Sequence, residues 1–527
     1  MMTQPMTRRQ FALLMSETMV AAPSLALGNG IGGPGDMAGS DEQPAPAGSQ
    51  AGAPVYMVLW FDTEDYILPA SDDAAKRIAD FLSDQGVRAT FKLVGEKARV
   101  LEARHRSDVI AALSRHEIGY HSNTHSQQPT IAEYESMLDW EQGAAEFGRR
   151  ERAGFDDISR IFGYAPTCFG QPGVSWAPQA YQALKNWGMH VYLDDGQQVG
   201  LDGKPFWYGG LLNIFGIEAG RGLEQNDDWS NLESAKDNFK KLHAQLSAQP
   251  AGGLVSFMFH PTQFISQVFW DAVNFAGGAN PPRSEWKSQP VKSTAQCEQA
   301  FQYFEGLIRY IKSLPNVRFV TASEAYSLYR DTAQTRSFAL DDLAKIAGQV
   351  TPQISFQVHD SYALSASEVF VLLNSFVTGY VTNSISGEIS LPDTPYGPSS
   401  VASGMASSHV DEVSWSQFSR TSLDVSQSLE INGSVPNVVW LGSSGVAPEA
   451  YLLGLSSVVT KLLRKEPPPE SVRLLPAELA AGKWIAKDSV SIWDWPIFPS
   501  GFHSPHLMEL ARLQAWTLKP ALLPTVR

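Results

Sequence analysis

Two histidines four residues apart, His121 and His125, have the spacing of a pair that binds one metal ion. Neutral imidazole is a common zinc ligand, and two imidazoles leave room for a carboxylate and a water molecule. Because such a pair also arises by chance, its weight depends on other residues that can face it. Two further stretches supply them: residues 60–65 contain three carboxylates, and residues 257–261 contain His260.

These side chains are sufficient for metal-assisted hydrolysis. A divalent cation makes a water molecule more acidic, a carboxylate that is not a ligand can accept the water proton, and a histidine can protonate a leaving amine. The residue set therefore predicts hydrolysis of an amide or an ester. Taken singly, the same residues have ordinary interpretations: Asp62 and Asp65 can cap the following helix, and His260 can be a buried histidine of the core.

The segments that must position these residues alternate between apolar strands and amphipathic helices. Strands are predicted at 55–61, 89–94, 117–121, 190–193, 254–259 and 317–320, and helices at 71–86, 105–114, 131–150, 177–187, 232–247 and 296–313. This alternation predicts an α/β fold, a distorted (β/α) barrel with a parallel sheet. Functional residues of such barrels lie at the C-terminal ends of strands, where Asp62, His121 and His260 fall.

Length and composition limit the remaining possibilities. A chain of 527 residues exceeds the usual size of one domain, so we expect the barrel at 54–335 and a second, mixed or mainly helical domain of no assigned role at 340–527. A hydrophobic content of 43% excludes wholesale disorder, and a net charge of −15 argues against nucleic acid as a partner. The two cysteines exclude a disulfide scaffold and a cysteine-rich zinc site.

The N-terminus has the pattern of an export signal. Arg8 and Arg9 precede an apolar stretch and then small residues, as in a twin-arginine signal over residues 1–30. Residues 31–53, rich in Gly, Ala, Pro and Ser, are predicted to be a flexible leader. We therefore expect a periplasmic or extracellular protein. No other run is long enough to cross a membrane, so the mature protein is predicted to have no transmembrane segment.

Residues 55–330 resemble the polysaccharide deacetylases of the carbohydrate esterase family 4 type. Residues 60–65 (Trp-Phe-Asp-Thr-Glu-Asp) are similar to the family's strand that ends in an aspartate pair, and residues 121–125 (His-Ser-Asn-Thr-His) match its H-[ST]-x-x-H motif. Residues 89–95 (Ala-Thr-Phe-Lys-Leu-Val-Gly) are similar to its A-T-F-F-x-x-G strand, and residues 254–260 to its last strand, which ends in a histidine. The motifs occur in the family's order over about half of the chain.

The resemblance implies a role for each residue. Asp62 would be the catalytic base and His260 the general acid, while Asp65, His121 and His125 would hold one divalent metal, for which zinc fits best. The protein would then be an exported, metal-dependent carbon–nitrogen hydrolase that removes N-acetyl groups from a glycan containing N-acetylhexosamine.

The chain departs from the family at two motifs. The family's third motif carries an arginine beside the catalytic aspartate, whereas the corresponding segment here has Gln171, which offers a hydrogen bond but no charge; Arg221 is a candidate replacement. The first motif has one inserted residue. If its strand continues, Asp62 and Glu64 share a face, and Glu64 rather than Asp65 becomes the acidic ligand.

These departures leave two alternatives open. The missing arginine favours a non-catalytic glycan-binding or assembly protein on a deacetylase fold, and a third possibility is an amide hydrolase of the same fold that acts on a small non-sugar substrate. On residues 196–231, Trp207, Tyr208, Asp228 and Trp229 can form a wall for sugar stacking or a buried staple for the segment. The sequence specifies no oligomeric state.

Overall fold

The structure is a computed structural model that describes residues 52–220, 229–385, 387–400 and 411–524. The predicted export signal and Arg221 lie outside these residues, as does the predicted leader except for its last two residues.

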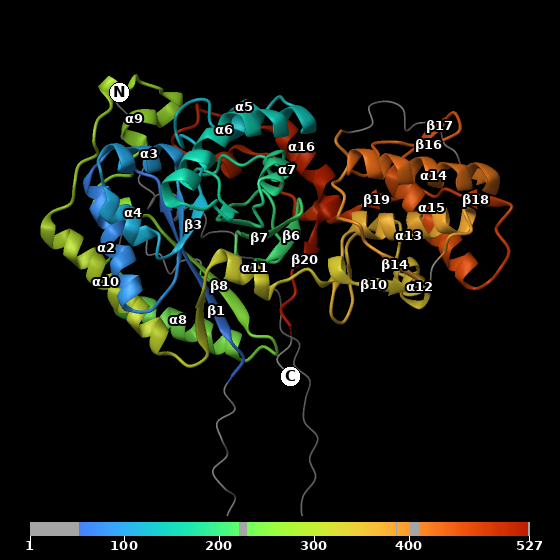
Figure 1. Cartoon of the computed structure of the whole chain (residues 1–527), viewed down its shortest axis with the longest axis horizontal. Helices are drawn as coiled ribbons and strands as arrows, with labels where there is room; N and C mark the ends of the chain where they lie inside the picture. The colour runs from blue at the N-terminus through green and yellow to red at the C-terminus, as the bar shows by residue number, and fades with distance from the viewer. Residues whose placement is uncertain (1–51, 221–228, 386, 401–410, 525–527) are drawn as a thin grey trace, which may run out of the picture.

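A curled, mostly parallel sheet forms the core of the larger part of the molecule (Figure 1). Its order is β20-β6-β7-β5-β4-β3-β2-β1-β8, and β9 pairs with β1. The pairings from β7 to β8 and that of β9 are parallel, whereas β6 and β20 are antiparallel additions. The strands are β1 (Val55–Thr63), β2 (Thr90–Leu93), β3 (Glu117–Tyr120), β4 (Cys168–Phe169), β5 (Val191–Asp194), β6 (Phe206–Tyr208), β7 (Leu211–Phe215), β8 (Gly253–Phe259), β9 (Val317–Val320) and β20 (Lys519–Pro520). The predicted α/β barrel fold is confirmed.

Helices pack around this sheet, and every residue of β1 is buried. They are α2 (Ala70–Asp84), α3 (Gly95–Ala103), α4 (Ser107–Leu113), α5 (Ile131–Glu135), α6 (Trp140–Phe162), α7 (Ala180–Asn186), α8 (Leu232–Ser247), α9 (Ala272–Phe275), α10 (Thr294–Ser313) and α11 (Ala322–Leu328). The helix predicted at 131–150 is two helices, because the Asp139 side chain accepts a hydrogen bond from Gln142 N at 2.8 Å and caps a new helix there.

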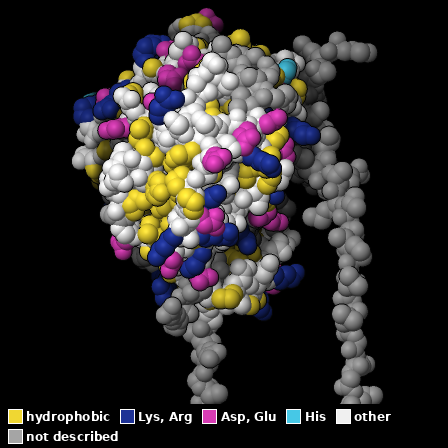
Figure 2. Space-filling model, turned by 90° about the vertical axis from the view of Figure 1, so that its right-hand side faces the viewer, with side chains coloured by type: hydrophobic (Ala, Val, Ile, Leu, Met, Phe, Trp, Pro, Cys, Tyr) yellow, Lys and Arg dark blue, Asp and Glu magenta, His cyan; other side chains and the backbone are white. Residues whose placement is uncertain are grey.

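A second hydrophobic core lies among the C-terminal helices. The helices are α12 (Leu340–Gly348), α13 (Ala366–Val381), α14 (Trp415–Asn432) and α15 (Pro448–Leu463). Paired short strands join them: β10 (Ser337–Ala339) with β14 (Glu388–Ser390), β11 (Gln353–Ile354) with β19 (Glu478–Leu479), β12 (Gln357–Val358) with β13 (Ala363–Leu364), β15 (Glu412–Ser414) with β18 (Ser471–Arg473), and β16 (Val439–Leu441) with β17 (Ser444–Val446). Figure 2 shows apolar side chains near the middle of this part's outer face, with charged side chains around them.

The end of the chain returns to the barrel. Residues 480–518, which include α16 (Pro505–Gln514), contribute Trp493, Trp495 and other apolar side chains to the barrel core, and β20 then pairs with β6. The expected second domain at 340–527 therefore holds two structural parts: the helices with their own core, and a final segment that belongs to the barrel. Among the described residues, no helix is long and apolar enough to cross a membrane.

A buried ion cluster fastens this final segment to both parts. The Lys519 ammonium lies 2.6 Å from Asp331 and 2.7 Å from Glu368, and Glu368 is fully buried in the first turn of α13. Burial opposes the charge of Lys519, but the two carboxylates outweigh it and raise the pKa of this lysine.

We predict that residues 54–335 do not form a stable monomer by themselves. Without residues 480–518, a large apolar area of the barrel core would face water. Size-exclusion chromatography and thermal unfolding of this fragment should show aggregation or no cooperative transition, whereas a chain of residues 54–527 should unfold cooperatively. A monomeric 54–335 fragment with a sharp transition would contradict this expectation.

A second prediction concerns Glu135, a fully buried carboxyl whose oxygens have no hydrogen-bond partner among the described residues. Burial, and then the negative charges of Glu146 and Glu151, raise its pKa from 4.5 to about 9. At a pH below both pKa values, Glu135 is protonated in the folded and in the unfolded chain and has no effect on how stability depends on pH. Between the two pKa values only the unfolded chain ionises at this residue, so the free energy of unfolding falls as pH rises. Each pH unit in that window corresponds to about 1.4 kcal/mol at most.

Glu135→Gln should therefore stabilise the protein by an amount that grows between about pH 5 and pH 9. Urea unfolding at several pH values measures it, and replacement of the exposed Glu141 by Gln controls for the loss of one charge. An advantage that stays constant across this range would show that Glu135 is not neutral in the folded protein.

Candidate metal centre

The C-terminal ends of three parallel strands bring the predicted site residues together. Asp62 is the last residue but one of β1, His121 directly follows β3, and His260 directly follows β8. These strands end at the same edge because β1 pairs in parallel with β8 and, on its other side, with β2, which pairs in parallel with β3. Glu64 directly follows β1, and His125 lies four residues after His121 in the loop that follows β3.

Three ligand atoms converge at this edge. Glu64 Oε2 lies 3.1 Å from His121 Nε2 and 2.7 Å from His125 Nε2. The other oxygen of Glu64 accepts a hydrogen bond from Trp270 Nε1 at 2.7 Å. Glu64, His121 and His125 are 3%, 1% and 3% exposed, and their ligand atoms all lie within 4.8 Å of one another. A buried carboxylate between two imidazoles is a donor set that fits a divalent metal.

The second ring nitrogen of each histidine is held by a hydrogen-bond partner. His121 Nδ1 lies 2.9 Å from the carbonyl oxygen of Gly170 and must donate to it, which leaves the lone pair on Nε2. His125 Nδ1 lies 2.6 Å from Ser126 Oγ. The backbone turns sharply between the two rings, because Ser122 and His125 have φ of 70° and 57°, a left-handed conformation that non-glycine residues rarely adopt.

Charge interactions within the cluster are consistent with this arrangement. Burial is the main cause that lowers the pKa of His121. Burial also acts against the charge of His125, but attraction to Glu64 raises the pKa of His125. For Glu64, burial alone would raise the pKa, yet attraction to His125 and His260 lowers it well below its ordinary value. The carboxylate is therefore ionised at neutral pH and attracts positive charge.

Asp62 and His260 lie beside this set. His260 Nε2 is 3.5 Å from Asp62 Oδ2, and His121 Nδ1 is 3.6 Å from Asp62 Oδ1. His260 Nδ1 lies 3.2 Å from Gln263 Oε1 and donates to it. Both side chains are buried. A carboxylate and an imidazole thus border the convergent ligand atoms, as acid–base chemistry at that point requires.

The structure does not bring Asp65 to the histidines. Its carboxylate accepts four hydrogen bonds elsewhere, from Ile67 N (3.0 Å), Leu68 N (3.1 Å), Thr262 Oγ1 (2.9 Å) and Gln289 Nε2 (2.6 Å). The physical reason is that β1 runs straight through Thr63, so Asp62 and Glu64 point to one side. Asp65 comes one residue later and closes the turn that leads into α2.

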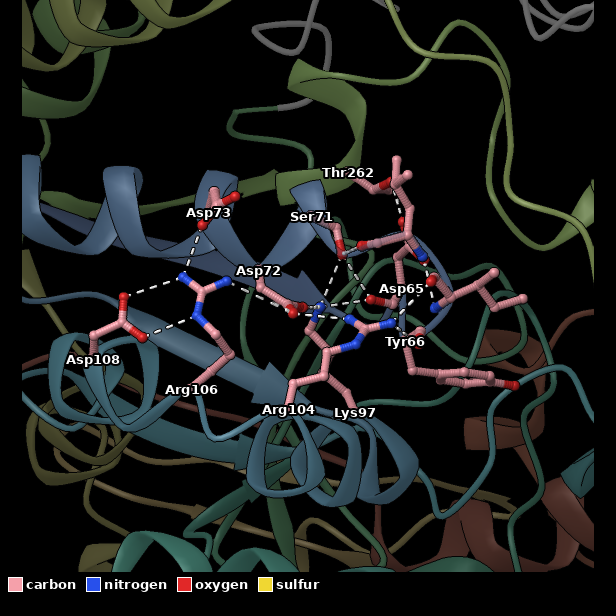
Figure 3. A network of polar contacts seen from close by, with 12 residues as sticks. Asp65, Tyr66, Ser71, Asp72, Asp73, Lys97, Arg104, Arg106, Asp108 and Thr262 are labelled. Carbon is pink, nitrogen blue, oxygen red and sulfur yellow. Dashed lines mark hydrogen bonds and ion pairs between the residues drawn. The ribbon is translucent and has the colours of Figure 1, made fainter.

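Figure 3 shows how this turn is secured. The Lys97 ammonium donates to the backbone oxygen of Asp65 at 2.6 Å, to Ser71 Oγ at 2.9 Å and to Asp72 Oδ1 at 2.5 Å. Arg104 binds the other oxygen of Asp72 at 2.8 Å. Asp72 is fully buried and joins α2 to α3. The helix-capping interpretation of Asp62 and Asp65 is wrong, because α2 begins after Pro69 without a side-chain cap, and Asp65 closes the turn before it through Ile67 N and Leu68 N.

Two tryptophans far apart in sequence enclose the centre. The ring of Trp270 lies 5.3 Å from the ring of His125, and the ring of Trp495 lies 5.5 Å from it at nearly a right angle. Neither tryptophan was predicted from the sequence, because neither belongs to a motif and no chemistry was expected after residue 340.

Of the two interpretations of the aromatic side chains on residues 196–231, a sugar-stacking wall or a buried staple, the structure supports the second for the residues it describes. Trp207 and Tyr208 are buried, and the Tyr208 hydroxyl donates to Ala511 O at 2.9 Å. Trp229 stacks on Phe259, while Asp228 lies outside the described residues. The buried-staple interpretation is therefore correct for the described residues of this segment.

Residues 51–192 match the polysaccharide deacetylase family. The predicted resemblance is confirmed for this part of the chain. A search of curated proteins found no match.

The chain is also similar, at low sequence identity, to several solved structures, including the following three. A protein described as a polysaccharide deacetylase from Mycobacterium smegmatis is 14% identical, with 54% of this chain and 93% of that chain covered and a TM-score of 0.34. A polysaccharide deacetylase from Pseudomonas aeruginosa PAO1 is 12% identical, with 52% and 92% covered and a TM-score of 0.35. The allantoinase PuuE is 14% identical, with 54% and 94% covered and a TM-score of 0.35. At these scores the likenesses carry no argument about activity.

A buried lysine lies beside the predicted catalytic aspartate, Asp62. Lys92, in β2, is fully buried and lies 2.9 Å from Asp62 Oδ1 and 2.5 Å from Asp194 Oδ2. Burial opposes its charge, but attraction to Asp194 and Asp62 raises the pKa of Lys92. The sequence left open which residue replaces the family's arginine beside Asp62, and in the structure a lysine lies there. Gln171, which the sequence offered instead, donates to the carbonyl oxygens of Gly173 and Asp195 at 3.4 Å.

One signal in the sequence pointed to this lysine. In the strand that resembles A-T-F-F, Lys92 takes the place of an apolar residue, and a lysine within a buried parallel strand needs an acidic partner. The identity of that partner follows only from the pairing of β1 with β2, which sets Lys92 beside Asp62.

We predict that Lys92→Met destabilises the protein by about 3–5 kcal/mol, because it leaves two buried carboxylates without their cation. Urea unfolding measures the loss. Adding Asp194→Asn to Lys92→Met should recover part of it, since burial and the negative charge of Asp62 already raise the pKa of Asp194 well above its ordinary value and disfavour a charge there. A single variant as stable as the parent would mean that these carboxylates do not depend on Lys92.

Proposed function

We propose that this protein is a metal-dependent hydrolase that removes N-acetyl groups from a glycan containing N-acetylhexosamine. The observation that carries the proposal is the convergence of Glu64 with the Nε2 atoms of His121 and His125, beside Asp62 and His260. The match of residues 51–192 to polysaccharide deacetylases supports a hydrolase of that kind. Export through a twin-arginine signal to the periplasm or beyond belongs to the proposal and rests on the N-terminal sequence alone.

Glu64, His121 and His125 would hold one divalent cation, with Glu64 in the place first expected of Asp65. The fit rests on three convergent donor atoms and on His125 Nε2, which is buried and has no hydrogen-bond partner with good geometry among the described residues. Two imidazoles and one carboxylate favour zinc. When bound there, the cation supplies Lewis acidity, which polarises an amide carbonyl and makes water a stronger acid.

The chain's own residues then move the protons. Asp62 accepts a proton from the attacking water as the water oxygen bonds to the acyl carbon. Lys92 holds Asp62 in place through their 2.9 Å contact. His260 donates a proton to the amine nitrogen as the carbon–nitrogen bond breaks, so that acetate and a free amine leave. Acid–base groups of this kind each contribute about a hundred- to ten-thousand-fold in rate.

One observation favours a compact amide as the alternative substrate. Asp62, Glu64, His121, His125 and His260 are each at most 6% exposed in the described structure. Side chains with so little exposure are reached more easily by a small molecule than by a polymer chain. The other alternative, a non-catalytic glycan-binding or assembly protein, was favoured by the missing arginine, and this argument weakens because Lys92 places a positive charge beside Asp62.

The test compares two neighbouring acidic residues. Glu64→Gln should weaken zinc binding by about tenfold or more, since it removes an anionic ligand. Asp65→Asn is the matched control and should keep the affinity, because Asp65 binds Thr262 and Gln289 instead. Zinc content after dialysis against a buffered chelator measures both. Unchanged affinity in Glu64→Gln would reject the ligand assignment.

Turnover is tested separately. Asp62→Asn should keep the metal and lower the rate of acetate release by about a hundredfold or more. A panel of N-acetylated oligosaccharides and small N-acyl compounds distinguishes the glycan from the compact amide. An Asp62→Asn variant as active as the parent would refute the hydrolytic mechanism.

A further inference from the structure

We propose that the C-terminal segment completes the metal centre, with Trp495 acting through Asp271 and Ser126 to orient His125 as a ligand. The inference rests on the proposed metal site and deepens it, because it assigns the last part of the chain a role in that site. Trp495, Asp271 and Ser126 are positioning residues, since they act through His125.

A continuous chain of hydrogen bonds leads from the indole of Trp495 to the imidazole. Trp495 Nε1 donates to Asp271 Oδ2 at 3.2 Å, and Ser126 Oγ donates to the same oxygen at 3.4 Å. Ser126 Oγ also lies 2.6 Å from His125 Nδ1. Asp271 and Ser126 are 1% and 0% exposed, so water does not compete for these bonds.

The direction of each bond follows from donor chemistry. An indole nitrogen only donates, and an ionised carboxylate only accepts, so Asp271 receives both the Trp495 N–H and the Ser126 O–H. The lone pairs of Ser126 Oγ are then left to accept from His125 Nδ1–H. This places the proton of His125 on Nδ1 and directs the Nε2 lone pair toward Glu64, 2.7 Å away. Such partners of metal-binding histidines raise ligand basicity and fix the ring.

Aromatic packing supports the same geometry. His125 lies against Trp270 and Trp495, with ring separations of 5.3 Å and 5.5 Å. Trp270 donates to Glu64 Oε1, so one tryptophan orients the carboxylate while the other, through Asp271, orients the imidazole.

The Trp495 ring packs closely against the backbone of Gly173. A Cβ atom on Gly173 would lie 2.4 Å from the Trp495 ring, and Gly173 has a φ of 53° that disfavours other residues. This glycine follows Gln171 in the segment where the sequence lacks the expected arginine. That segment therefore accommodates the C-terminal tryptophan, while Lys92 provides the charge.

The segment around Trp495 is held by loops of the barrel. Pro496 O and Ile497 O accept hydrogen bonds from Gly277 N at 2.7 Å and Gly278 N at 2.8 Å, in the loop after β8. Gln128, in the loop after β3, donates to Ile497 O at 3.2 Å. Backbone N–H groups of one loop and the Gln128 side chain of another thus hold the segment around Trp495 independently of its indole N–H.

The experiment removes single hydrogen bonds and measures zinc affinity by competition with a chromophoric chelator. Asp271→Asn and Ser126→Ala should weaken zinc binding by about 10- to 100-fold, the usual effect of losing such a partner. Trp495→Phe keeps an aromatic side chain but removes the indole N–H together with part of the ring system, and we expect it to weaken binding by about three- to tenfold.

Trp493→Phe is the matched control. Its indole lies in the same segment but donates to Asp488 at 2.8 Å, away from the centre, so zinc affinity should stay at the parent value. Combining Trp495→Phe with Asp271→Asn should weaken binding no more than Asp271→Asn alone, since both changes break one pathway.

Two further measurements separate this inference from a general effect on folding and from the proposed function. Thermal unfolding of the metal-free variants should match the metal-free parent, and cobalt loaded into the variants should give a changed visible spectrum. If Asp271→Asn does not fold, Trp495→Phe against Trp493→Phe decides the question. Parent affinity in Trp495→Phe and Ser126→Ala would overturn the inference, whereas a parent protein that binds no zinc would overturn the proposed function itself.

Discussion

The candidate centre depends on the uninterrupted course of β1 through Thr63. All nine residues of β1 are buried, and its parallel pairing with β2 continues to Thr63, which supports the course of the strand at its C-terminal end. Alternation along a straight strand places Asp62 and Glu64 on one side and sends Asp65 into the next turn. Glu64 therefore contacts the two histidines, Asp62 takes the position of the proposed proton acceptor, and Asp65 closes the backbone turn.

Charge balance is the second constraint on this edge of the sheet. Three acidic side chains, Asp62, Glu64 and Asp194, lie in a region with almost no solvent access. Buried charges of one sign destabilise a protein unless cations or hydrogen bonds compensate them. Lys92 compensates Asp62 and Asp194, and the pair of histidines meets Glu64. The remaining attraction for positive charge at Glu64 is what a divalent cation would use.

The return of the chain makes the two parts of the molecule interdependent. The final segment crosses from the second core to the barrel, contributes Trp495 to the centre, and ends in a strand whose Lys519 binds Asp331 and Glu368. The helical part has no cluster of metal-binding residues among those described. Its evident structural contribution is to carry the chain back to the barrel and to anchor Lys519 through Glu368.

The sequence by itself determined the features that depend on local pattern. Apolar runs identified β1 and β8, because strands buried on both faces need such runs, and the alternation of strands with helices placed β2 and β3, each to within about two residues. The rule that functional residues follow strand ends located Asp62, His121 and His260. The spacing of His121 and His125 indicated that both bind one metal ion, and the order of motifs indicated the deacetylase family.

Only the tertiary structure decided which side chains face one another. Glu64 and Asp65 are adjacent acids, and only the straight end of β1 distinguishes them. Lys92 and Trp495 are ordinary residues in sequence; the first gains its partners from strand pairing, and the second reaches His125 across hundreds of residues because the final segment packs in the barrel core. The periodicity of the sequence indicates whether a residue is buried. Which residues it contacts depends on packing between segments that are far apart in the sequence.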